Sequence, residues 1–150
     1  DIYSNIMAMN PDRYADAIEK AKEMKALYTN NRVAKMQADN DYDGIIAMAD
    51  KMIAENPADA LAYKLRLQAY SGKQDYDKVI ELGEEAAMAQ QADDEKSDIY
   101  FLIGAAYNAK YNASGNKDVA MKDKAIEALK KVVAGSNVEA AAKSVADLSK

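Results

Sequence analysis

Acidic side chains gather between Asp39 and Asp50 in an order that could bind a calcium ion. The segment opens Asp39-Asn40-Asp41-Tyr42-Asp43-Gly44 and reaches Asp50 six residues later. Calcium prefers oxygen ligands at alternate positions of a twelve-residue loop, with a glycine at the sixth position for a sharp turn. The oxygens would come from Asp39, Asp41, Asp43, the Ile45 carbonyl and Asp50, with Ile46 at the usual apolar position.

This order resembles calcium loops of the EF-hand and dockerin kinds, but a second copy of the segment argues against ion binding. Asp50 is one methylene shorter than the usual glutamate. In the second copy the acidic tripeptide persists while the first ligand and the glycine are lost, leaving Lys73, Asp75, Asp77 and Lys78. We therefore favour a turn and helix cap, with calcium binding as an alternative. A calcium loop keeps residues 43–47 non-helical, whereas a helix cap places them in a first helical turn.

No other cluster suggests catalysis or a bound cofactor. The chain has no histidine and no cysteine, which removes the commonest general base, metal ligand and thiolate nucleophile. Neither a nucleophile and base pair nor a phosphate-binding glycine loop is present. We therefore predict that the protein is not an enzyme and has no catalytic residues, cofactor or metal site.

The acidic tripeptide also marks a repeat. Tyr42 and Tyr76 stand 34 residues apart, each within Asp-Tyr-Asp, and each opens a stretch that is apolar at every third or fourth residue. A period of this length is typical of stacked helical hairpins. The chain resembles the tetratricopeptide-repeat family, whose second-helix slots match Ile45, Ala49, Met52 and the closing Pro57, then Val79, Gly83 and Ala86.

The first-helix pattern of that family is also present twice. Tyr100, Ile103, Gly104 and Tyr107 reproduce it in full, and residues 62–70 reproduce it with Leu67 in the glycine slot. The small residue lets paired helices approach closely, so an uncompensated larger side chain would cost roughly 1 to 3 kcal/mol. We expect the helix pair that contains Leu67 to be splayed or repacked.

The resemblance implies an all-α fold, a superhelix of antiparallel helix hairpins, within a single domain over residues 1–150. Residues 1–25 would form degenerate N-terminal helices, residues 26–59, 60–93 and 97–136 the repeats, and residues 137–150 a capping helix. The last repeat has 18 residues between Tyr107 and Ala125, where the preceding one has 9 between Tyr70 and Val79. We expect this insertion, near 110–118, to form a surface loop.

Periodicity and turn signals predict the individual helices. Asn30-Asn31 marks a break after the second helix, and Asn116 is a plausible cap for the helix that follows the insertion. The predicted helices cover residues 1–9, 12–28, 32–39, 43–55, 59–70, 76–90, 96–109, 116–134 and 137–148.

Composition limits the class of partner. The net charge of −5 and the lack of a basic stripe make nucleic acid an unlikely partner. The longest uncharged apolar run, Ile99 to Tyr107, is far short of the roughly 20 residues that span a bilayer, so we expect a soluble chain without membrane insertion. Both a cytoplasmic and an exported location stay open.

The family resemblance implies a protein-interaction module that receives a peptide or partner helix on the first helices of its repeats. We expect Phe101 to be an apolar anchor and Lys64, Gln68 and Asn108 to contact peptide backbone or a carboxylate. The predicted binding set comprises Leu61, Lys64, Gln68, Ser71, Asp98, Phe101, Ala105 and Asn108. Self-association into an architectural assembly through the capping helices is a further alternative.

Overall fold

The protein is all-helical over the part that the computed structural model describes, which is residues 5, 8 and 11–150, with the side chains of 11–14 left out. The helix predicted over residues 1–9 falls almost entirely outside the described residues. The helices of the described chain are α2 (Pro11–Ala38), α3 (Tyr42–Glu55), α4 (Ala60–Gly72), α5 (Tyr76–Ala89), α6 (Asp93–Ala113), α7 (Val119–Lys130) and α8 (Val138–Leu148).

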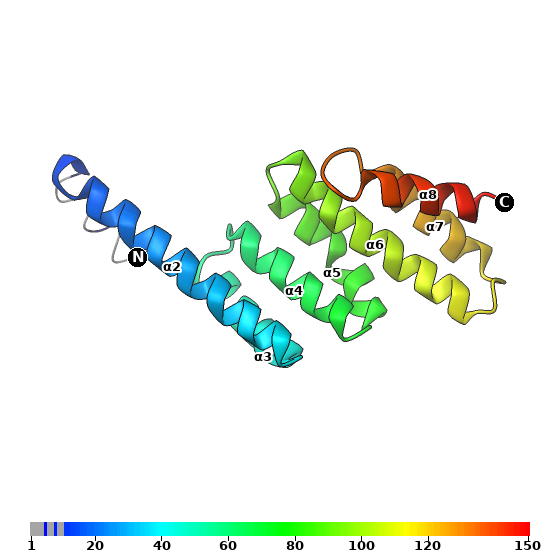
Figure 1. Ribbon diagram of the computed structural model, residues 1–150, viewed down its shortest axis with the longest axis horizontal. Coiled ribbons are helices and arrows are strands. Elements are labelled where there is room, and N and C mark those ends of the chain that lie inside the picture. Colours follow the sequence, from blue (N-terminus) through cyan, green and yellow to red (C-terminus); the bar gives the residue numbers. More distant parts are fainter. Residues whose placement is uncertain (1–4, 6–7, 9–10) are drawn as a thin grey trace. The chain divides into compact units, whose positions relative to one another are not determined.

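The chain divides into two compact units, residues 1–41 and residues 42–150. In the second unit each helix packs against the next in sequence, and α4 also packs against α6 (Figure 1). Short connections make successive helices antiparallel, so the second unit is a row of helical hairpins. The predicted all-α arrangement is confirmed. That both units form one domain, with repeats at the expected boundaries, stays a prediction.

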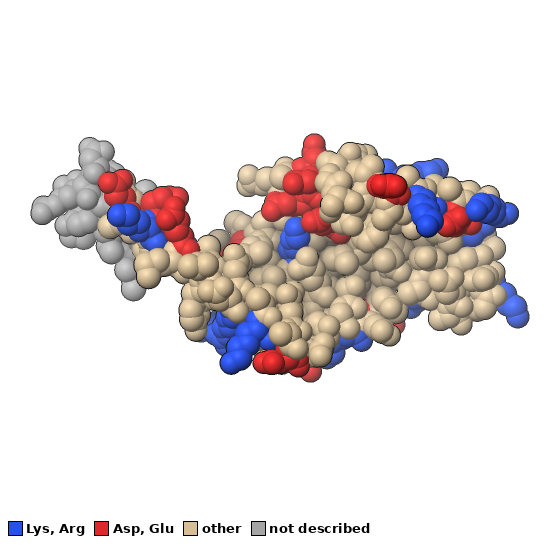
Figure 2. All heavy atoms as spheres, viewed as in Figure 1, with Lys and Arg blue, Asp and Glu red and all other residues tan. Residues whose placement is uncertain are grey.

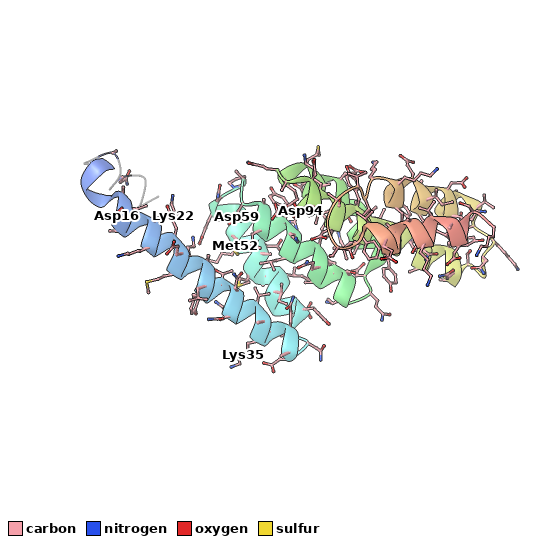
Figure 3. All side chains as sticks on the ribbon, turned by 45° about the horizontal axis from the view of Figure 1, so that its top comes forward. Asp16, Lys22, Lys35, Met52, Asp59 and Asp94 are labelled. Atoms are coloured by element: carbon pink, nitrogen blue, oxygen red, sulfur yellow. The ribbon has the colours of Figure 1, made fainter. Side chains whose placement is uncertain are left out.

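Aspartate caps begin three of these helices. Asp59, at the start of α4 in Figure 3, accepts a hydrogen bond from the Ala62 amide at 3.3 Å. Asp75 does the same for Lys78 at the start of α5, at 3.2 Å. Each carboxylate satisfies an amide that has no partner inside the helix and also interacts favourably with the helix dipole.

The α7 cap differs from the prediction. Asp118, not Asn116, caps this helix by accepting from the Met121 amide at 3.2 Å, and the helix ends at Lys130. Asn116 instead has a φ of 61° in the turn before it. Asparagine tolerates this left-handed conformation, which suits a turn and cannot begin a right-handed helix.

The predicted break at Asn30-Asn31 is wrong, because α2 continues through it to Ala38. Asparagine costs a helix only a fraction of a kcal/mol relative to alanine, far less than proline does. The neighbouring Thr29 hydroxyl donates to the Lys25 carbonyl at 2.9 Å, a bond made within the helix. The helix ends at Ala38, and Asn40 in the turn that follows has a φ of 55°.

The core of the second unit runs between α4, α5 and α6. Leu67 is only 1% exposed and shares a buried cluster with Tyr63, Val79 and Ile103. Gly83 on α5 faces α6, since a Cβ added to it would come within 2.5 Å of Ile103 Cγ1. In the next hairpin Gly104 takes the small position, against Leu129. Leu67 is thus accommodated inside the core, and the expected splaying or repacking of its helix pair stays a prediction.

The two Asp-Tyr-Asp tripeptides share part of their surroundings. Asp43 on α3 pairs with Lys73 at the end of α4, and Asp77 on α5 pairs with Lys110 near the end of α6. Ile45 and Val79, three residues after each tyrosine, are both fully buried. The second aspartate of each copy therefore links its helix to the next helix in the sequence.

Residues 43–47 lie in the first turns of α3. This conformation is not that of an EF-hand loop, in which these residues curl around the ion. Asp43 also directs its carboxylate to Lys73. The geometry on which the calcium alternative depends is not adopted.

Candidate functional site

The predicted binding set comes from two helices that pack side by side, α4 and α6. Leu61 and Ala105 are exposed, whereas Gln68 and Ser71 on α4 are half-buried. The set thus mixes accessible apolar side chains with amide and hydroxyl groups. Such a surface can contact both the side chains and the backbone of a bound segment.

Two members of the set bind each other. Lys64 Nζ lies 2.8 Å from Asp98 Oδ2, and both side chains are mostly shielded from solvent. The other oxygen of Asp98 accepts from Asn137 Nδ2 at 2.9 Å, just before α8. Lys64, Asp98 and Asn137 therefore form one polar row across α4, α6 and the start of α8. Since Asp98 already compensates its charge, Lys64 is not a free cation for a partner carboxylate.

Phe101 is half-buried and packs against a small core of Leu129, Val132 and Ala141, contributed by the region around α7 and by α8. Only part of the side chain remains for a partner. Its role as an apolar anchor stays a prediction. Replacement of Phe101 would also disturb the packing of α8.

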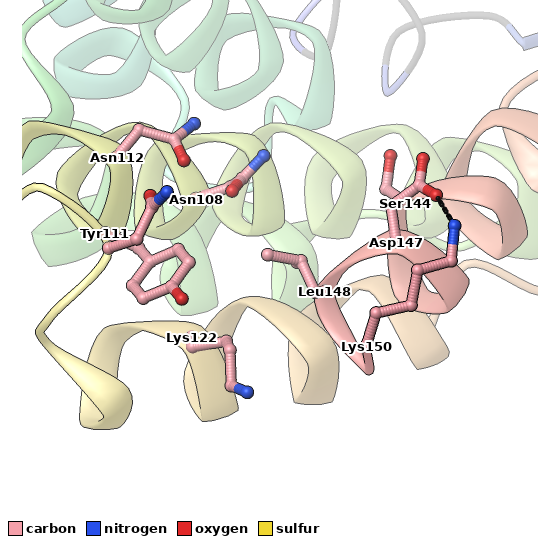
Figure 4. A pocket seen from close by; sticks show the side chains of 9 residues that line it. Asn108, Tyr111, Asn112, Lys122, Ser144, Asp147, Leu148 and Lys150 are labelled. Atoms are coloured by element: carbon pink, nitrogen blue, oxygen red, sulfur yellow. Dashed lines mark hydrogen bonds and ion pairs between the residues drawn. The ribbon is translucent and has the colours of Figure 1, made fainter.

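Asn108, the last member of the set, lines a cavity of about 380 Å³. Figure 4 shows side chains of α6, α7 and α8 around this space. The lining residues are Asn108, Tyr111, Asn112, Asn116, Lys122, Ser144, Asp147, Leu148 and Lys150. Asn108 Oδ1 is buried and accepts no hydrogen bond from the described residues.

The insertion builds one wall of this cavity. Helix α6 begins at Asp93 and continues to Ala113, longer at both ends than predicted. Its first turn is acidic, which favours helix at that end, and no further glycine or proline occurs between Gly104 and Gly115. Ser114 then closes a compact turn, with its hydroxyl donating to the Tyr111 carbonyl at 2.6 Å and accepting from the Lys117 and Asp118 amides.

A second polar group lies between α5, α6 and the end of α7. Tyr100 OH donates to Glu84 Oε2 at 3.2 Å, while Lys131 Nζ lies 3.3 Å from Glu84 Oε1 and above the Tyr100 ring. Burial raises the pKa of Tyr100, and the negative charge of Glu84 raises it further. The phenol therefore keeps its proton and acts as a hydrogen-bond donor that ties the hairpins together.

Basic and acidic side chains are interspersed over the visible face of the second unit (Figure 2). Within the described range, no three carboxylates are placed to hold a metal ion together. None of the helices between residues 11 and 150 has the length and apolar character needed to cross a bilayer.

Several residues of this region were not found from the sequence. Asn137 was taken only as the start of the last helix, yet its side chain is committed to Asp98. Ser97 is fully buried, and its hydroxyl accepts from the Val133 and Ala134 amides at 3.1 Å each. No sequence pattern pointed to Lys122. Each of these side chains meets residues that lie more than ten positions away in the sequence.

Comparison of the chain with protein-family models, with curated proteins and with solved structures finds no match. The functional interpretation therefore depends on the residues and their arrangement.

Proposed function

We propose that this protein is a tetratricopeptide-like interaction module that binds an extended peptide or a partner helix across α4 and α6. The supporting observation is that the exposed members of the predicted binding set lie on two first helices that pack together. Leu61 and Ala105 offer apolar contact area, and Gln68 offers an amide that can both donate to and accept from a peptide backbone.

The electrostatics of the surface refine the kind of partner. The ion pair of Lys64 with Asp98 contributes no net charge. Recognition would therefore depend on shape, apolar contacts and backbone hydrogen bonds more than on an acidic chain end. An internal segment of a partner protein fits this surface better than a terminal carboxylate does.

Affinity capture from the source organism's lysate tests the proposal. The sequence alone would suggest Lys64→Ala and Phe101→Ala as test variants. The first removes the ion-pair partner of Asp98. The second removes a side chain that packs in the core around α8. Leu61→Glu and Ala105→Glu are cleaner, because both positions are exposed. A negative charge at either position should expel an apolar partner group without disturbing the fold.

The matched control is Met88→Glu, on α5, where the native side chain is 77% exposed. We expect the same captured protein to disappear with both α4 and α6 variants and to persist with the control. Retention of the partner by both variants, or the absence of any specific partner, would overturn the proposal.

Self-association is a second candidate, favoured by an observation in the first unit. Met24, Leu27 and Tyr28 lie on one face of α2, and each is more than 60% exposed. Large exposed apolar side chains at this spacing are typical of a helix that packs against another helix. Light scattering that reports a monomer at high concentration would exclude this candidate, whereas a dimer lost on Leu27→Glu would support it.

A further inference from the structure

The insertion between α6 and α7 supplies residues to the cavity described above. Tyr111 and Asn112 come from the extra turns of α6, and Asn116 from the turn closed by Ser114. The preceding hairpin ends its first helix at Gly72 and has no equivalent of these side chains. The volume, about 380 Å³, lies within the range of small-molecule sites. The extra residues thus create a space that the repeat itself does not provide.

Two polar groups in this cavity have unused bonding capacity. Asn108 Oδ1 is buried without a hydrogen bond from the described chain. Lys122 has no carboxylate within ion-pair distance among the residues described. The other cavity lysine differs, because Lys150 Nζ lies 2.8 Å from Asp147 Oδ1. Buried polar groups in folded proteins are normally satisfied, so an unpaired one beside a cavity suggests that a ligand completes it.

The two groups specify complementary chemistry. The ammonium of Lys122 favours an anion, and the single charge of a carboxylate matches it. The Asn108 amide requires a polar ligand group near its buried end. A hydroxyl, which both donates and accepts, satisfies an amide in either of its two orientations.

The other side chains that line the cavity favour the same class of ligand. Asn112, Asn116 and Ser144 add donors and acceptors, while Leu148 and the Tyr111 ring provide a limited apolar surface (Figure 4). A ligand that carries several hydroxyls on a short carbon chain would match both parts. We propose that this cavity binds a small polyhydroxylated carboxylate of the sugar-acid class.

Three six-carbon probes separate the two required features. Gluconate carries the carboxylate and the hydroxyls, hexanoate only the carboxylate, and sorbitol only the hydroxyls. In an NMR titration of amide signals we expect gluconate to shift residues 108–122 and 144–150, with affinity at least about tenfold above that of either control probe. Equal binding of the three probes, or no binding of gluconate, would overturn the proposal.

Variants locate the site. Lys122→Gln removes the free charge and should abolish the advantage of gluconate over sorbitol. Lys117→Gln is the matched control, because Lys117 is exposed in the neighbouring turn and does not line the cavity. Circular dichroism of both variants confirms that the fold persists. Unchanged gluconate binding by Lys122→Gln would contradict the assignment.

This inference is independent of peptide binding on α4 and α6. Leu61→Glu and Ala105→Glu should leave the gluconate titration unaltered, since neither residue lines the cavity. Loss of gluconate binding with these two variants would place the ligand elsewhere and overturn the proposal. Failure of the peptide proposal would leave the gluconate result unchanged.

Discussion

Single glycines decide how closely neighbouring helices of the second unit approach. A Cβ on Gly104 would lie 2.6 Å from Leu129 Cγ and 3.4 Å from the Ala125 carbonyl oxygen. No real side chain makes a contact as short as the first of these. Gly83 stands in the same relation to Ile103. These positions require glycine for lack of space, since neither has a positive φ.

We expect Gly104→Ala to lower the free energy of unfolding by about 1 to 2 kcal/mol. Overpacking of a close contact costs about 1 to 3 kcal/mol, and the higher helix propensity of alanine returns up to about 1 kcal/mol. Urea denaturation measures the difference.

The control is Gly115→Asn, where nothing lies within 4 Å of an added Cβ. Its φ of 69° is one that asparagine tolerates, so this variant should remain close to wild type. A Gly104→Ala protein as stable as the control would show that the helices separate at little cost.

At the scale of the element, α8 covers an apolar surface that the preceding hairpin leaves open. Ala141 on α8 is 1% exposed and packs with Leu129 and Val132. Half-buried Phe101, Val145 and Leu148 extend the same cluster. Docking of α8 thus shields apolar side chains of α6 and of the α7 region from solvent.

Neighbouring alanines of α8 give a matched test of this role. Ala141→Glu places a carboxylate in the apolar cluster and should destabilise the protein by more than about 2 kcal/mol. Ala142→Glu, on the exposed side, should change the free energy of unfolding by less than about 0.5 kcal/mol. Equal effects in thermal or urea unfolding would show that α8 does not dock as described.

Ion pairs between successive helices form a second kind of link. The hydrogen bond to Asp43 raises the pKa of Lys73 above its ordinary value of 10.5. A raised pKa means that the folded protein holds this proton more tightly than the unfolded chain. The pair therefore stabilises the fold below pH 10.5, and its contribution is lost as the pH rises through the raised pKa.

We expect Lys73→Met to lower Tm at pH 8 and low salt, by a small amount because the pair is exposed. The difference from wild type should shrink as the pH rises through the raised pKa of Lys73, and in about 1 M salt, where charges are screened. Lys117→Met, at an exposed lysine without an ion pair in the described chain, is the control. A difference independent of both pH and salt would assign the effect to packing of the lysine stem.

At the scale of the molecule, the second unit is held together mainly by contacts between helices adjacent in sequence. Central helices have neighbours on both sides, whereas α8 packs at one end. In such arrays stability is nearly a sum over neighbouring pairs, so end elements open more readily than central ones.

Hydrogen exchange should therefore be slowest in α5 and α6 and clearly faster in α8. Mass spectrometry of peptides from each helix gives this order directly. Equal protection of α8 and α6 would indicate one cooperative unit in which the end helix opens only on global unfolding.

Local signals predicted much of this protein. Helix starts at Ala60 and Tyr76 were close to the expected positions, because an aspartate cap and apolar periodicity act within a few residues. The break at Asn30-Asn31 was wrong, since a weak breaker does not stop a helix that neighbouring residues favour. The insertion was predicted as a loop, but its first part extends α6 as far as Ala113.

The sequence by itself determined that the chain is all-helical, where most helices lie and that a 34-residue period orders part of them, because propensity, capping and periodicity are local. Only the tertiary structure decided that Lys64 is neutralised by Asp98, that Phe101 packs beside α8, and that Asn108 faces a cavity shared with Lys122. These relations join separate helices. They depend on the rotation and spacing of packed helices, which no local pattern specifies.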